Sequence, residues 1–184
     1  MDDIVKQAMA KWPNVPDCYG WLGLDARGNW FMRDDRAQAC GAFASGKPGA
    51  KGSMLQHAKL IEFIERNYAS DAQGGWFFQN GPQRVYVELE ATPRVWRMDE
   101  RGAISSNAGQ PAAFERLLMD EHGWPYLQTS AGFGLVHTQD VGALAAAVER
   151  YAWPVEEVLL ADLPQRFAYC TSPQALHLPA PHGQ

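Results

Sequence analysis

The 184-residue sequence has few cysteines, no long apolar run and no excess of basic residues. Its three cysteines, Cys18, Cys40 and Cys170, include no Cys-x-x-Cys pair, so we predict neither a disulfide framework nor a zinc site. No apolar run approaches the about 20 residues that a membrane-spanning helix needs. The N-terminus lacks the basic and apolar segments of a secretory signal. These absences predict reduced thiols, no membrane partner and a cytoplasmic protein.

The charge balance is acidic, with 16 Lys and Arg residues against 21 Asp and Glu residues. Nucleic-acid-binding proteins use clusters of Lys and Arg to neutralise phosphates. The densest basic stretch here, Arg94, Arg97 and Arg101, is interrupted by Asp99 and Glu100. We therefore predict no nucleic-acid partner.

Hydrophobic residues make up 46% of the chain, enough for the core of one domain or of two small ones. Helical spacing of these residues predicts helices over 3–11, over 53–68, from Pro111 to Gly123, and from Thr138 or Asp140 to Tyr151. Ser53 and Gln56 fit a capping box at the start of the second helix.

Period-2 alternation and turn residues predict strands between these helices. Gly28 and the pair Asn80-Gly81 are the clearest hairpin signals. A turn at Pro93 would return the chain antiparallel to 85–89, so that Glu88 and Arg97 face each other. The predicted hairpins pair 19–25 with 29–33, 126–129 with 133–137, and 155–160 with 167–170.

The order of elements repeats. The Pro-Gln-Arg at Pro82 recurs at Pro164, each time after a helix and two apolar residues. We predict an α+β fold of two tandem α-ββ-α-ββ(β) halves, with antiparallel sheets covered by helices. The halves would span 1–100 and 103–172, followed by an irregular tail over 173–184.

Two stretches carry a family resemblance. Asp25-Ala26-Arg27-Gly28-Asn29-Trp30 through the helix around Lys59-Leu60-Ile61, and Gly75-Trp76 through Pro93, resemble a family of uncharacterised proteobacterial proteins of unknown function. The resemblance covers about the first 100 residues. It implies repeated helix-hairpin motifs and a role in signalling or ligand sensing, and it carries over no catalytic residues.

Motifs for chemistry are weak. Gly41, Gly46 and Lys47 have the spacing of a phosphate-binding P-loop, but Pro48 stands where that motif needs Ser or Thr, so we interpret 41–52 as a surface loop. No two histidines have the spacing of a metal pair, and we predict no metal or cofactor. A Cys170–His137 dyad is the basis of the enzymatic alternative, an unconventional hydrolase or transferase.

The seven tryptophans are many for this length, and most are expected in the core. Those beside arginines could instead line a cleft for a small anionic ligand, which a guanidinium binds with two hydrogen bonds. We therefore predict a non-enzymatic ligand-binding or sensor module with its site between the halves. The candidate ligand-binding residues are Arg84, Arg94, Arg166, Trp76 and Trp96. An oligomerising structural protein is a further alternative.

Overall fold

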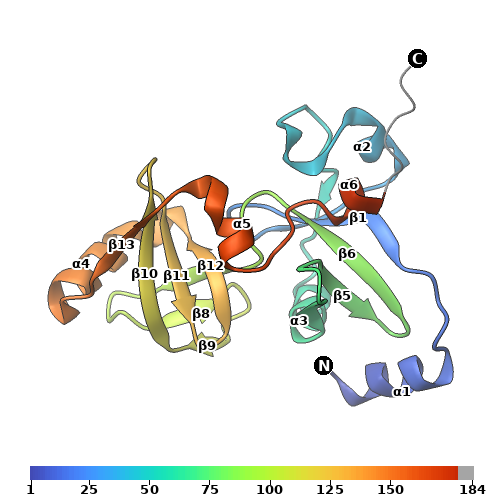
Figure 1. Cartoon of the computed structure of the whole chain (residues 1–184). Coiled ribbons are helices and arrows are strands. Elements are labelled where there is room, and N and C mark those ends of the chain that lie inside the picture. The colour runs from blue at the N-terminus through green and yellow to red at the C-terminus, as the bar shows by residue number, and fades with distance from the viewer. Residues whose placement is uncertain (178–184) are drawn as a thin grey trace. The chain divides into compact units, whose positions relative to one another are not determined.

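The computed structural model describes residues 1–177, which form an α+β protein of two compact units (Figure 1). Unit 1 contains residues 1–25, 29–90 and, among the described residues, 169–177. Unit 2 contains residues 26–28 and 91–168. The chain thus leaves unit 1 for unit 2 and returns to unit 1 at its C-terminal end.

Unit 1 is built on a six-stranded mixed sheet of order β3-β2-β1-β6-β5-β4. All neighbours are antiparallel except β1 and β6, which are parallel. The strands are β1 (Cys18–Leu24), β2 (Trp30–Met32), β3 (Ser53–Met54), β4 (Tyr68–Ser70), β5 (Trp76–Asn80) and β6 (Gln83–Leu89). The predicted hairpins at Gly28 and Asn80-Gly81 are confirmed, and Gly28 takes the expected positive φ of 76°.

Helices cover both faces of this sheet. The helices of unit 1 are α1 (Asp3–Lys11), α2 (Asp35–Cys40), α3 (Ala58–Arg66) and α6 (Pro173–His177), with the short 3₁₀ helix η1 (Phe43–Ser45). On one face, Phe63 of α3 packs edge-on against Phe78, and the Trp30 indole donates to Glu65 at 3.0 Å. On the other face, α6 contacts β1 and β6, and the Phe43 ring fills the space above Gly23.

The start of α3 corrects the predicted capping box. Ser53 belongs to β3 and pairs with Met32. The helix begins at Ala58, where the Nδ1 atom of His57 accepts a hydrogen bond from the Leu60 amide at 3.3 Å. Pairing of Ser53 with the neighbouring strand therefore overrides its local tendency to cap a helix.

A buried guanidinium organises the face of the sheet that α6 covers. Arg33 is 0% exposed. Its Nε donates to the Ala50 carbonyl at 2.8 Å, and its two Nη atoms donate to the Gly20 carbonyl at 3.1 Å and the Gly41 carbonyl at 2.6 Å. A buried charge is costly unless it is hydrogen-bonded, and these carbonyls satisfy it.

Glu88, 2% exposed, lies on the same face and holds the C-terminal segment. Its carboxylate accepts from the Ser172 hydroxyl at 2.5 Å and from the Gln174 amide at 2.9 Å. Burial raises the pKa of Glu88, while these two hydrogen bonds and the charge of Arg33 oppose that rise. The two hydrogen bonds to Glu88 explain how residues 172–177 are attached to unit 1.

Unit 2 is built on a seven-stranded mixed sheet of order β13-β10-β11-β12-β7-β8-β9. Its strands are β7 (Val95–Met98), β8 (Ile104–Ser106), β9 (Pro111–Ala112), β10 (Phe114–Asp120), β11 (Pro125–Thr129), β12 (Gly132–Val136) and β13 (Val155–Val158). The β10–β13 and β12–β7 pairs are parallel. The expectation of purely antiparallel sheets is therefore wrong in both units.

The core of unit 2 lies between this sheet and α4 (Val141–Tyr151), which Figure 1 shows beside the strands. Leu144 and Ala147 of α4 pack into a buried cluster with Trp96, Leu117 and other apolar side chains of the sheet. Asp140, at the start of α4, receives two hydrogen bonds from Arg97, at 2.6 and 3.2 Å. Arg97 does not pair with Glu88 as predicted, because β6 and β7 belong to different sheets.

The predicted helix from Pro111 to Gly123 is wrong, because this segment forms β9 and β10. Leu117 and Leu118 are both buried, at 1% and 0% exposure, on opposite faces of β10. A strand that is buried on both faces carries consecutive apolar residues, and so does a helix face. Pairing with β11 and β13 decides between them.

The final predicted hairpin is also wrong. Residues 155–158 form β13, parallel to β10, whereas 160–162 form the 3₁₀ helix η3 (Leu160–Asp162) and the next residues form the helix α5 (Leu163–Arg166). Pro164 suits the first turn of α5 because that turn needs no amide donor there. The two Pro-Gln-Arg segments thus differ in structure, because the first lies in a hairpin of unit 1 and the second lies in the helix α5 of unit 2. The predicted repeat of two halves is not confirmed.

The start of the predicted irregular tail, residues 173–177, is helical, and the rest of it, 178–184, lies outside the described residues. A further 3₁₀ helix, η2 (Thr138–Asp140), precedes α4. Within residues 1–177, no helix combines the length and apolar character required to cross a membrane.

The central role of the buried guanidinium is testable. We expect Arg33→Met to lower the free energy of unfolding by about 3–5 kcal/mol, because it leaves buried carbonyls without a donor and Glu88 without a nearby positive charge. Urea denaturation of the full chain measures this change. Arg36→Met, at an exposed position of α2, is the matched control and should change stability by less than about 0.5 kcal/mol. Equal effects of the two substitutions would contradict this role for Arg33.

Candidate functional site

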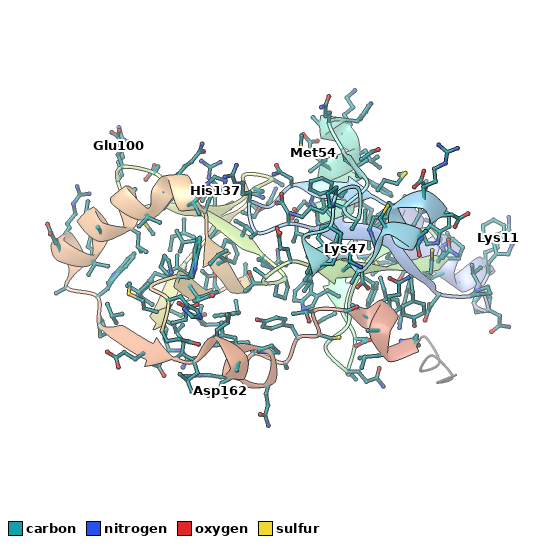
Figure 2. The ribbon with its side chains drawn as sticks, turned by 90° about the horizontal axis from the view of Figure 1, so that it is seen from above. Lys11, Lys47, Met54, Glu100, His137 and Asp162 are labelled. Atoms are coloured by element: carbon teal, nitrogen blue, oxygen red, sulfur yellow. The ribbon has the colours of Figure 1, made fainter. Side chains whose placement is uncertain are left out.

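A surface pocket of about 610 Å³ lies in unit 2, where β10 and β13 end. Small-molecule sites commonly have volumes of about 300–1,000 Å³. The lining combines apolar side chains, four carboxylates and one guanidinium. The lining residues are Met119, Asp120, Glu121, Val155, Glu157, Val158, Leu159, Asp162 and Arg166. Asp162, labelled in Figure 2, comes from the segment between β13 and α5.

Asp120 is a structural part of this pocket. It is 6% exposed, and its Oδ1 accepts from the amides of His122 and Trp124, both at 2.9 Å. Its Oδ2 accepts from the Tyr126 hydroxyl at 2.9 Å. These bonds fix the turn between β10 and β11 and satisfy the carboxylate, so Asp120 shapes the pocket more than it offers a free group.

The other carboxylates of the pocket are more accessible. Glu121 accepts from the Leu160 amide at 2.8 Å, and this bond lowers the pKa of Glu121, so the side chain is ionised at neutral pH. Glu157 and Asp162 are exposed. Arg166 forms an ion pair with Glu156, which also lies 3.6 Å from Arg116. The accessible charge of the pocket is therefore predominantly negative.

Arg84, a predicted ligand-binding residue, lies in a different cluster, in unit 1. Its guanidinium lies 4.7 Å from the centroid of the Phe77 ring. On the same face, the Tyr86 hydroxyl donates to Asp71 at 2.8 Å, and the Tyr86 ring stacks on Tyr19 at 4.6 Å. His177 of α6 also stacks on Tyr19, at 4.1 Å. Arg84 thus faces a stack of aromatic rings and one carboxylate.

Asp71 has a lowered pKa in this cluster. Burial on its own raises the pKa of the carboxyl group, but the hydrogen bonds from Tyr86 and from the amides of Gly75 and Gln73 outweigh it, with help from Arg84. Burial, together with the same contact with Asp71, raises the pKa of the Tyr86 hydroxyl. Asp71 is therefore ionised and Tyr86 neutral near neutral pH.

The other four predicted residues do not share a site with Arg84. Trp76 lies on the opposite face of β5 from Phe77 and packs on Tyr68 at 4.7 Å. Trp96 is 0% exposed in the core of unit 2, and the Arg94 guanidinium lies 6.0 Å from its ring. Of the five predicted residues, the structure places Arg166 in the acidic pocket.

The residues of the enzymatic alternative belong to different units, Cys170 to unit 1 and His137 to unit 2. Burial raises the pKa of the Cys170 thiol, which keeps it in the less nucleophilic protonated form. The Nδ1 atom of His137, a residue labelled in Figure 2, accepts from the Gln139 amide at 3.1 Å. Among residues 1–177, no group of three or more His, Cys, Asp or Glu side chains is placed to hold a metal ion.

The sequence analysis missed the acidic pocket because the secondary structure or the strand pairing of the segments that line it was predicted incorrectly. The segment of Asp120 was expected to be helical, and β13 was expected to pair with 167–170. The pairs Asp120-Glu121 and Glu156-Glu157 are visible in the sequence, but adjacency alone does not distinguish a pocket from a solvated surface. Only the parallel pairing of β10 with β13 brings them together.

The fold and the pocket define a two-unit α+β protein with mixed sheets and an acidic, partly apolar surface pocket. The chain belongs to the DUF2944 family, described as a protein of unknown function (DUF2946), whose model matches residues 1–174. The resemblance to an uncharacterised family is thereby confirmed. The sequence matches no curated protein.

Two solved structures, both of DUF1285 family proteins, are similar to parts of this chain. The protein from Shewanella baltica OS155 is 13% identical, with a TM-score of 0.47, over 68% of this chain and 90% of that chain. The protein from Silicibacter pomeroyi DSS-3 is 14% identical, with a TM-score of 0.47, over 78% of this chain and 83% of that chain.

The lowered pKa of Asp71 predicts a pH-dependent contribution to stability. Because the folded pKa lies below the ordinary value of 3.8, this contribution is complete above that value and is lost as the pH falls through the folded pKa. We expect Asp71→Asn to cost about 1 kcal/mol at pH 7 and less at pH 3. Urea denaturation at both pH values measures the difference from the wild type. Glu62→Gln, at an exposed position of α3, should show no such trend, and a pH-independent effect of Asp71→Asn would refute the assignment.

Proposed function

We propose that the protein is a non-enzymatic binding module and that the acidic pocket of unit 2 holds a small ligand. The observation that carries this proposal is the combination in one pocket of about 610 Å³ of apolar walls with accessible carboxylates. Apolar side chains such as Met119, Val158 and Leu159 would bury the body of the ligand. The carboxylates would orient its polar group.

The charge of the lining sets the class of ligand. Glu121, Glu157 and Asp162 would repel an anion at this position and attract an ammonium group. Arg166 is neutralised by its ion pair with Glu156. We therefore propose an amine with an apolar body as the ligand of this pocket, whereas the arginines beside tryptophans suggested an anion in the sequence.

This proposal fits a sensing role. The pocket is open to solvent, and Cys170, the nucleophile of the enzymatic alternative, has the raised pKa of an unreactive thiol. Occupancy of the pocket would then be the signal that a partner of the protein detects. The experiment that follows tests the binding step, on which such a role depends.

Three six-carbon probes with different head groups test the class of ligand. We expect hexylammonium to shift the amide resonances of residues 155–162 with a lower Kd than hexanol, and hexanoate to bind most weakly. The expected order follows from the negative charge of the pocket. A ¹H–¹⁵N titration of the full chain measures the three Kd values.

Arg166→Gln separates the two possible ligand charges. If the pocket binds an amine, removal of the positive charge releases Glu156 and should lower the Kd of hexylammonium about two- to fivefold, as expected for an exposed charge pair. If Arg166 instead binds an anion, the substitution should raise the Kd of hexanoate. Lys59→Gln in unit 1 serves as the control and should change neither value.

Two results would overturn the proposal. Tighter binding of hexanoate than of hexylammonium would exclude the amine class. Resonance shifts that are not confined to the lining residues, or that do not saturate with any probe, would exclude this pocket as a ligand site.

A further inference from the structure

A second pocket, of about 320 Å³, lies in unit 1 and has the opposite chemistry. Its lining contains Lys47, Lys51, three glycines and the ring of Phe43, with Glu90 as its acidic member. Lys47, labelled in Figure 2, lies on the loop between η1 and β3. Two ammonium groups against one carboxylate leave an excess of positive charge in the lining.

The loop that forms this pocket has a defined shape. Arg33 holds it from the protein interior, through the carbonyls of Gly41 and Ala50. Two tight turns follow, with the Ala50 amide bonded to the Lys47 carbonyl at 3.2 Å and the Gly52 amide bonded to the Gly49 carbonyl at 3.1 Å. A preformed loop binds a small ligand without the entropic cost of ordering it.

Lys51 occupies a distinctive position in the pocket. Its ammonium lies 2.7 Å from a carboxylate oxygen of Glu90, and 5.7 and 5.8 Å from the centroids of the Phe43 and Phe31 rings. The side chains of Lys51 and Glu90 are 34% and 32% exposed. The ammonium is thus partly withdrawn from water, its direction is fixed, and Glu90 is the counter-ion that an incoming anion would have to displace.

The loop does not have P-loop architecture. Pro48 follows Lys47 where Ser or Thr would bind magnesium, and the loop leads into the short strand β3 instead of a helix. The pocket therefore suits a small anion that needs no metal ion and no nucleotide pocket. A phosphate group, free or on a small molecule, fits this volume and is a chemical match for ammonium donors.

We propose that this loop and Glu90 form a second binding site, which takes a small phosphate-like anion, and that Glu90 is the built-in counter-ion that the anion displaces from Lys51. This site is independent of the amine pocket in unit 2 and shares no residue with it. The 41–52 segment, predicted from the sequence as a surface loop, is thus proposed to bind a phosphate-like anion.

The proposal predicts opposite effects for two substitutions in one ion pair. In a ¹H–¹⁵N titration with inorganic phosphate at constant ionic strength, we expect saturable shifts at residues 46–52 of the wild type. Lys51→Met should raise the Kd at least tenfold, because the anion loses its fixed ammonium. Glu90→Gln should lower the Kd about two- to fivefold, because the competing carboxylate is gone.

A control variant and a second probe make the test decisive. Lys59→Met, at an exposed position of α3, should leave the Kd unchanged and so excludes a general charge effect. A loss of folding cannot produce the tighter binding expected of Glu90→Gln. Glycerol 3-phosphate, titrated in parallel, distinguishes the two sources of the phosphate group, since tighter binding than inorganic phosphate indicates a phosphate monoester as the ligand.

The outcomes that overturn the proposal are equally definite. Shifts that grow linearly with phosphate and are the same in all variants would mean that no site exists. Unchanged or weaker binding by Glu90→Gln would exclude Glu90 as the displaced counter-ion. Both results can be obtained whether or not the amine pocket of unit 2 binds its probes.

Discussion

The guanidinium of Arg33 is the constraint on which unit 1 depends. A charge with no exposed surface must be satisfied by the chain around it, and Arg33 binds one carbonyl of β1 and two carbonyls of the 41–52 loop. These contacts fix the 41–52 loop to the sheet. With the buried Glu88, which binds residues 172 and 174, they also explain why the end of the chain returns to unit 1.

In each of the two pockets, some polar side chains stabilise the fold and others are accessible to a ligand. Asp120 is saturated by two amides and a hydroxyl, so it shapes the acidic pocket, whereas Glu157 and Asp162 remain accessible to a ligand. The loop that Arg33 fixes has the same division of roles, because the buried guanidinium sets the loop's shape and Lys51 faces the pocket. In both pockets, internal hydrogen bonds fix the shape of the lining, and partly exposed charges would determine the selectivity of the proposed sites.

The two pockets differ in the charge of their linings, so a different class of ligand is proposed for each. The sequence suggested arginines as anion-binding groups, yet Arg166 is held by Glu156 among carboxylates and Trp96 is enclosed in a core. The proposed anion site uses lysines of the 41–52 loop, whose glycine spacing is visible in the sequence. That loop is not a P-loop, because Pro48 replaces the Ser or Thr of the motif and a strand follows instead of a helix. The two proposed sites of this chain differ in chemistry and can be tested separately.

Local sequence signals determined the elements whose formation needs no distant partner. The first helix, the turns at Gly28 and Asn80-Gly81 and the helix that ends at Tyr151 follow from capping, turn chemistry and helical periodicity. Tertiary structure alone decided the rest. The apolar pair Leu117-Leu118 suits a helix as well as a strand, and only its pairing with β11 and β13 selects the strand. The parallel β10–β13 pair joins residues almost 40 positions apart, so no local pattern could reveal the acidic pocket that it forms.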